Sequence, residues 1–154
     1  MSERRPESLA NPLSSRPRVG PGAAVGITEE MIRDLVHAFY GEIRRDPALV
    51  PIFKRVLGGD WDAHLAKMCD FWSSVLLMTG RFKGSPMTAH AQIPDIRPTH
   101  FARWLHLFRL TAERLCPAPA AALFVAKSEM IAESLQLGIA ASRGELPAAR
   151  RRPT

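Results

Sequence analysis

Residues 80–97 read GRFKGSPMTAHAQIPDIR, an interval of eighteen residues in which no long helical or strand pattern can be placed. Glycines and prolines interrupt any regular repeat, and Pro86 can start only about one or two helical turns, which would end near His90. A simple helical bundle would close such an interval with a short turn. The stretch therefore needs another explanation, and its lone histidine is the residue to explain.

On both sides of this interval the apolar residues repeat at helical spacing. The expected long helices cover residues 28–45, 61–78, 98–115 and 119–139. Thr28 and Asp60 can cap the first two, Gly80 can stop the second, and Asp46-Pro47 can begin a short helix between them. No segment alternates between polar and apolar residues in the manner of a strand. The sequence therefore predicts an all-α protein with four substantial helices and short connectors.

The positive charge of the chain is concentrated at its two ends. Of 21 basic and 15 acidic residues, residues 1–26 and 141–154 together hold eight basic and three acidic ones, which leaves 13 basic and 12 acidic residues between them. No aromatic residue stands between these arginines to stack on a base. We therefore expect one domain over residues 27–140 with a disordered extension at each end, and no specific binding of nucleic acid.

Membrane insertion and secretion both lack their sequence signals. No apolar run approaches the about twenty residues that span a bilayer, and the apolar stretch near the start is too short for the core of a signal peptide. The two cysteines, Cys69 and Cys116, are too few for a disulfide scaffold or a structural zinc site. We expect a cytoplasmic protein whose cysteines pack inside the fold.

Most catalytic chemistries lack their residues in this chain. There is no His-Glu-x-x-His helix, no Cys-x-x-Cys pair and no strand that could lead into a phosphate-binding loop. Haem ligation asks for less: one imidazole must reach iron in an apolar slot, with a few hydrogen-bond donors on the other face. Bound oxygen carries partial negative charge, so such donors stabilise it. The residues that could supply this set are His90, His64, Tyr40 and Trp104.

Five runs of residues stand in order between residues 27 and 139. They are Phe39-Tyr40-x-x-Ile43-Arg44-x-Asp46-Pro47 with Pro51-Ile52-Phe53, Asp60-Trp61-x-x-His64 with Asp70-Phe71-Trp72-Ser73-Ser74, Phe82-x-Gly84-x-Pro86-Met87-x-x-His90, His100-Phe101-x-x-Trp104-Leu105-x-Leu107-Phe108, and Ile131-Ala132-x-Ser134-Leu135. In this order and at this spacing they resemble the truncated haemoglobins, especially the third group of that family. One run alone would be weak evidence, but five in order make chance similarity a poor explanation.

The resemblance implies a truncated globin-like, two-over-two helical sandwich around haem b. Carried over by position, His90 is the proximal iron ligand, and Tyr40, His64 and Trp104 face the bound ligand. The residues that the resemblance places against the haem are Phe53, Met68, Phe71, Trp72, Phe82, Ile93, Trp104 and Phe108.

Each of the four polar residues also has a purely structural interpretation. His90 could lie on the surface of a short helix, and His64 could be a hydrogen-bonded core residue. Tyr40 could pack with its hydroxyl at the rim, whereas Trp104 belongs to the core in either case and only the direction of its indole N–H is open. The remaining histidines are expected to be exposed or structural: His37, His100 and His106.

The function implied by the resemblance is reversible binding of O₂, NO, CO or similar ligands at a pentacoordinate iron. One alternative is a haem enzyme for NO dioxygenation or peroxide reduction with an external reductase, because the same donors help to polarise an O–O bond. A further alternative is a haem-free helical interaction module, against which the presence of His90 and the polar residues argues.

Overall fold

The computed structural model describes residues 20–91, 93 and 95–144. Every regular element among them is helical. In chain order the elements are the 3-10 turn η2 (Ala23–Val25) and the helices α2 (Glu29–Arg44), α3 (Val50–Leu57), α4 (Trp61–Leu77), α5 (Pro86–Ala91), α6 (Pro98–Leu115) and α7 (Ala118–Ser142). The all-α prediction is confirmed, and α5 is the short helix expected within the irregular interval.

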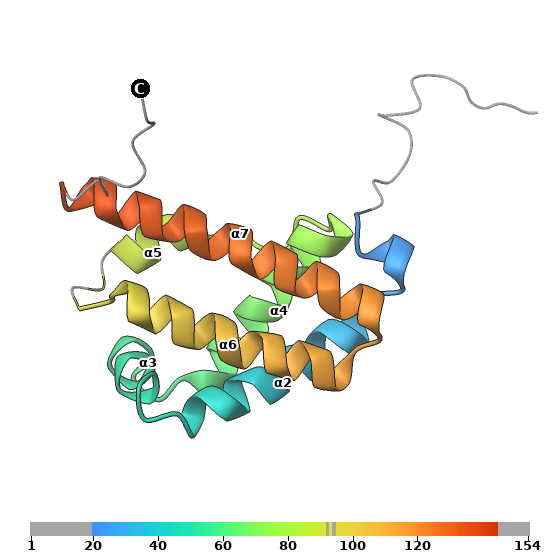
Figure 1. The fold of residues 1–154 in the computed structure, drawn as a ribbon, viewed down its shortest axis with the longest axis horizontal. Helices are drawn as coiled ribbons and strands as arrows, with labels where there is room; N and C mark the ends of the chain where they lie inside the picture. Colours follow the sequence, from blue (N-terminus) through green and yellow to red (C-terminus); the bar gives the residue numbers. More distant parts are fainter. Residues whose placement is uncertain (1–19, 92, 94, 145–154) are drawn as a thin grey trace, which may run out of the picture.

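The helices are arranged as two packed pairs. α2 packs on α4, and α6 packs on α7, with α2 also against α6 and α5 against α7 (Figure 1). In the figure α6 and α7 lie side by side. This is the two-over-two helical sandwich expected from the sequence. Among the described helices, none is both long and apolar enough to cross a bilayer.

The predicted caps of the first two long helices are present. Thr28 Oγ1 accepts a hydrogen bond from the N–H of Met31 over 3.1 Å and so begins α2. Asp60 accepts a longer one, 3.4 Å, from the N–H of Ala63 at the start of α4. These side chains satisfy backbone donors that the first helical turn leaves without a partner.

The end of α4 lies within one residue of the predicted end at about Met78, but the residue that stops the helix is not the predicted Gly80. The helix ends at Leu77, and Met78 already has a left-handed backbone with φ 57°. The N–H of Gly22 donates to the carbonyl of Leu76 over 2.8 Å. The Leu76 carbonyl therefore has a hydrogen-bond partner outside the helix, so it does not need one from a further helical turn.

A buried carboxylate connects the turn between α2 and α3 to α6. Asp46 is 4% exposed, pairs with Arg103 over 2.7 Å and accepts the N–H of Leu49 over 3.1 Å. The short helix predicted to begin at Asp46-Pro47 starts only at Val50, because a turn precedes it. The ion pair holds the end of α2 against α6.

The apolar interior has two parts. The main cluster lies between the helix pairs, and its centre is aromatic: Phe108 contacts Phe39 and Trp72 with ring centroids 5.1 and 5.2 Å apart. The smaller cluster joins the C-terminal half of α7 to the start of α6 and the loop before it. Its buried members are Ile96, Phe101, Ala132, Leu135 and Ile139.

The predicted N-terminal extension is wrong at its inner edge. Residues 20–26, assigned to disorder over 1–26, pack against the end of α4 and form η2. A Cβ atom on Gly20 would lie 2.2 Å from the carbonyl oxygen of Leu76, so this close approach requires glycine. The rest of the predicted extension lies outside the described residues.

The predicted C-terminal boundary is also wrong, because the folded part extends further than predicted. Helix α7 was expected to end at 139 and the tail to begin at 141, but the helix continues through Ser142. Ile139 is buried in the smaller cluster, and two alanines, which favour helix, follow it. The predicted tail beyond residue 144 lies outside the described residues.

Candidate functional site

An apolar cavity of about 430 Å³ lies within the sandwich, and α2 to α7 all contribute to its walls. Most of its lining side chains are aliphatic or aromatic. The residues that the sequence placed against a haem and that line this cavity are Phe53, Met68, Phe71, Trp72, Phe82, Ile93 and Trp104. The same cavity is lined by Tyr40, His64 and His90.

Phe108 is a correction to the predicted wall, because it does not line the cavity. It is 1% exposed and lies behind the wall, stacked on Trp104 with ring centroids 5.3 Å apart and on Trp72 with centroids 5.2 Å apart. Trp104 and Phe108 are one helical turn apart on α6, and the tryptophan covers the phenylalanine. Phe108 therefore supports the wall and does not form it.

Several lining residues were missed by sequence reasoning. The apolar spacing of Ile52 and Val56 on α3 could have found two of them, whereas α7 is apolar over too much of its circumference to reveal which side faces a cavity. The missed residues are Leu49, Ile52, Val56, Leu57, Lys67, Gly84, Ser85, Pro86, Ala89, Ile96, His100, Phe101, Ile131, Ala132 and Leu135.

His100 lines the cavity and also has the structural role expected of it. Its Nδ1 accepts a hydrogen bond from the backbone N–H of Arg97 over 2.9 Å, which closes the first turn of α6. The other two histidines expected to be exposed or structural, His37 and His106, are exposed.

His90 is half-buried on α5, and its imidazole has a defined hydrogen-bond partner. Nδ1 lies 2.7 Å from the carbonyl oxygen of Pro86, one turn earlier in the same helix. A carbonyl only accepts, so Nδ1 donates the hydrogen and Nε2 keeps its lone pair. The ring of Phe101 lies beside it, with centroids 6.2 Å apart. A neutral imidazole with Nε2 available is the form in which histidine binds a metal.

Tyr40 and Trp104 form a pair in another part of the wall. The Tyr40 side chain is 4% exposed, and burial raises its pKa far above the ordinary value, with a smaller opposite effect from a hydrogen bond to the Trp104 side chain. An indole N–H can only donate, so Trp104 donates to the Tyr40 oxygen. The phenol thus stays protonated at neutral pH and keeps its own O–H to donate elsewhere.

His64 stands next to Tyr40, with ring centroids 4.9 Å apart and planes at 87°. The pKa of His64 is lowered to about 4, mainly by burial, with smaller contributions from electrostatic interaction with Lys67 and His90. Its Nε2 is buried and has no hydrogen-bond partner among the described residues. A buried polar atom without a partner is uncommon in a folded protein, and it indicates that something absent from the polypeptide contacts this atom.

The residues around the cavity fit a flat, apolar macrocycle. The walls are aromatic and aliphatic, His90 offers one lone pair, and the polar atoms of Tyr40 and His64 are not used up by protein partners. By contrast, no group of three or more metal-ligating side chains occurs in the described part of the chain. Burial also raises the pKa of both cysteine thiols, Cys69 and Cys116, as expected of packing residues.

A helical sandwich around an apolar cavity with an imidazole in its wall is the arrangement expected of a globin. One similar solved structure is the crystal structure of the group III truncated hemoglobin from Campylobacter jejuni, with a TM-score of 0.71, 28% identity and coverage of 82% of this chain and 96% of that chain. The group 3 truncated hemoglobin ctb of Campylobacter jejuni subsp. jejuni serotype O:2 is 31% identical over 113 residues, which are 71% of this chain and 89% of that protein. No family model matches the chain.

The chain belongs to the group 3 truncated haemoglobins. The resemblance seen in the five sequence runs is confirmed, and membership of this family makes the chain a globin haem protein.

Proposed function

We propose that this protein holds haem b through His90 and reversibly binds O₂ and other diatomic ligands such as NO and CO on the opposite face. The observation that supports this most is the hydrogen bond of 2.7 Å from His90 Nδ1 to the Pro86 carbonyl. It sets the tautomer whose Nε2 can bind iron and fixes the plane of the ring. In this proposal His90 would be the one protein side chain that holds the iron, and the iron would be pentacoordinate in the absence of a gas.

The apolar walls have two tasks in this proposal. They bury the macrocycle through the hydrophobic effect, and they keep water away from the polar groups that face the ligand. Haem iron, when bound, supplies the coordination position for the gas. Aromatic wall residues from three segments, Phe53, Phe71 and Phe82, contribute the flat surfaces that such a group packs against.

The polar residues would stabilise the partial negative charge that bound O₂ carries. Tyr40 donates its O–H, while its oxygen accepts the hydrogen bond from the Trp104 side chain. We assign Trp104 the task of orienting that phenol. The neutral His64 can either donate or accept through its unpartnered Nε2.

Titration of the purified apoprotein with haem tests the proposal. The wild type is expected to bind one haem per chain with a sharp Soret band, and the reduced form is expected to bind CO. His90→Gly is expected to lose stable haem binding, whereas His106→Gly, at an exposed histidine of α6 that does not line the cavity, keeps it. A wild type without a stoichiometric Soret band, or a His90→Gly variant with the wild-type spectrum, would contradict the proposal.

A reductase partner and a cytoplasmic location remain predictions from the sequence. The enzymatic alternative, NO dioxygenation or peroxide reduction, would use the same cavity, and steady-state turnover with NO and O₂ or with peroxide would distinguish it.

A further inference from the structure

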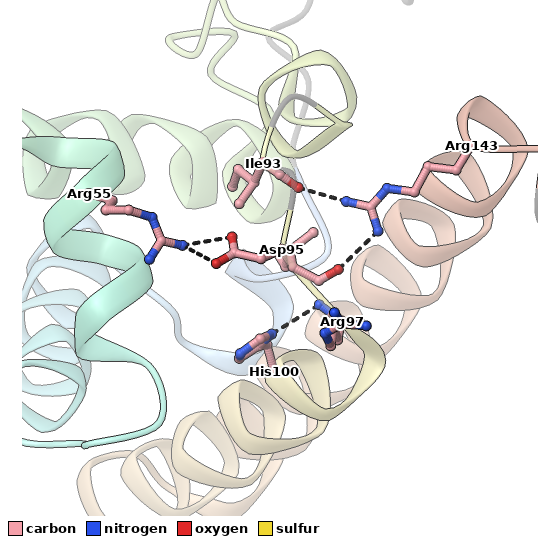
Figure 2. A network of polar contacts seen from close by, with 7 residues as sticks. Arg55, Ile93, Asp95, Arg97, His100 and Arg143 are labelled. Carbon is pink, nitrogen blue, oxygen red and sulfur yellow. Dashed lines mark hydrogen bonds and ion pairs between the residues drawn. The ribbon is translucent and has the colours of Figure 1, made fainter.

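Residues 93 and 95–97 follow α5 and are called the post-α5 loop. This loop is held by Arg143, at the C-terminal end of α7. The guanidinium of Arg143 donates to the carbonyl oxygen of Ile93 over 2.7 Å and to that of Ile96 over 3.1 Å (Figure 2). A planar guanidinium can bind two acceptors at once, which a lysine ammonium does not do in a fixed geometry. Both isoleucines line the cavity.

The contact with Ile93 leads directly to His90. The N–H of Ile93 donates to the carbonyl oxygen of His90 over 3.1 Å, and the His90 ring donates to Pro86. Arg143 thus binds the carbonyl of Ile93, while the N–H of the same residue binds the backbone carbonyl of His90. Displacement of Ile93 would move the end of α5 and, with it, the direction of the imidazole.

Arg143 is itself fixed to the body of the fold. Its backbone N–H bonds to the carbonyls of Ile139 and Ala140 at the end of α7, and the Ile139 side chain is buried in the same small cluster as Ile96. Its positive charge at a helix C-terminus is also favourable toward the helix dipole. The anchor is therefore a structured helix end, and the loop is the part that depends on it.

The opposite side of the loop has a weaker attachment. Arg55 on α3 forms an ion pair with Asp95, with a nitrogen–oxygen distance of 2.6 Å, but both side chains are about half exposed (Figure 2). Exposed ion pairs contribute little because water and salt screen them. The Arg143 contacts are partly buried and reach backbone atoms, so they hold the loop more firmly.

We propose that Arg143 is a positioning residue for His90: by fixing the Ile93 and Ile96 carbonyls, it holds the imidazole in line with the cavity and slows loss of the cofactor. The inference rests on the proposed role of His90 as the iron ligand. It concerns how the ligand is held, so it can fail while the proposed function stands.

The test compares Arg143→Met and Arg143→Lys with Arg114→Met in the haem-loaded protein. Arg114 is an exposed arginine in the last turn of α6, at the opposite end of that helix from the post-α5 loop, and it controls for the loss of one positive charge. Transfer of haem to excess apomyoglobin should be about tenfold faster for Arg143→Met, intermediate for Arg143→Lys, and unchanged for Arg114→Met.

A second readout reports the bond itself. In the reduced, ligand-free protein, the iron–imidazole stretching band in the resonance Raman spectrum should shift or broaden for Arg143→Met and stay in place for Arg114→Met. Hydrogen exchange in the apoprotein should be faster over the post-α5 loop and α5 only, which measures the hold on the loop without any haem.

The outcomes separate the two claims. If the wild type binds haem but Arg143→Met matches Arg114→Met in haem transfer and in the Raman band, the inference is wrong and the proposed function stands. If local exchange rises in Arg143→Met while the wild type shows no iron–imidazole band, the hold on the loop is real but the proposed ligand is wrong, and the inference falls with it. Global unfolding of Arg143→Met would also contradict the local role that we assign.

Discussion

The cavity wall with Tyr40, His64 and Trp104, called the ligand-side wall after its proposed role, and the wall with His90 are built in different ways. The ligand-side wall, with Tyr40, His64 and Trp104, belongs to the main apolar cluster or packs on it. The His90 wall consists of a helix of six residues and the post-α5 loop, resting on a small cluster and tied by backbone hydrogen bonds. Packing thus orients the groups that we propose to contact the gas, whereas polar contacts orient the histidine that we propose as the iron ligand.

This difference predicts that substitutions in the two walls affect the stability of the fold to different extents. A change behind the ligand-side wall removes contacts shared by most helices, so it should destabilise the whole fold. A change in the His90 wall removes contacts of one short segment, so it should loosen that segment first.

Phe108→Ala should lower the free energy of unfolding by about 3–5 kcal/mol, because it leaves a hole at the centre of the main cluster. Phe101→Ala, in the smaller cluster, should lower it by less, because Phe101 is more peripheral (7% against 1% exposed). Urea denaturation of both apoproteins measures this. Equal losses of unfolding free energy in the two variants would contradict the proposed difference between the two walls.

The stability of the apoprotein should decrease as the pH is lowered, because of His64. Its folded pKa of about 4 lies below the unfolded value of 6.5, so between these values the unfolded chain binds more protons and acid favours unfolding. The loss from about pH 7 to about pH 5 should be about 2 kcal/mol. His64→Leu should remove this part of the slope and His37→Leu, at an exposed site, should keep it; an unchanged slope in His64→Leu would place the burial of this imidazole in doubt.

The positions of the helices could be predicted from the sequence because local signals determine them. Thr28 and Asp60 are caps, Pro86 and Pro98 start helices, and apolar spacing marks the buried faces. These signals act within a few residues, so one sequence contains enough information to read them.

The parts that the sequence did not predict depend on distant groups. Phe108 shares a face with Trp104, and periodicity alone does not say which of the two reaches a cavity. Arg143 looked like one of several arginines in a tail, because its acceptors are backbone carbonyls 47 and 50 residues away. The early end of α4 depends on a glycine N–H more than fifty residues earlier in the chain.

Tyr40→Phe should speed release of O₂ from the haem-loaded protein by about tenfold, because it removes one hydrogen bond to a charged acceptor. Stopped-flow displacement of O₂ measures the rate. CO, a weaker hydrogen-bond acceptor, serves as the control and should leave at a nearly unchanged rate. An unaltered O₂ rate would take Tyr40 out of the ligand-side wall as a donor.

Asp95→Asn should have the smallest effect, a loss of less than about 1 kcal/mol in the free energy of unfolding, because the pair with Arg55 is half exposed. The loss should shrink further in high salt. Chemical denaturation at low and high salt measures both. A larger loss that salt does not reduce would mean that this ion pair, and not Arg143, is the main attachment of the post-α5 loop.

The most direct test of the account is a crystal structure of the haem-loaded protein, because three imidazoles, those of His64, His90 and His100, line the cavity. We predict that Nε2 of His90 binds the iron, that its Nδ1 still donates to the Pro86 carbonyl, and that Tyr40 and His64 lie on the other face. Iron bound by His64 or His100 alone, or haem outside this cavity, would contradict the account.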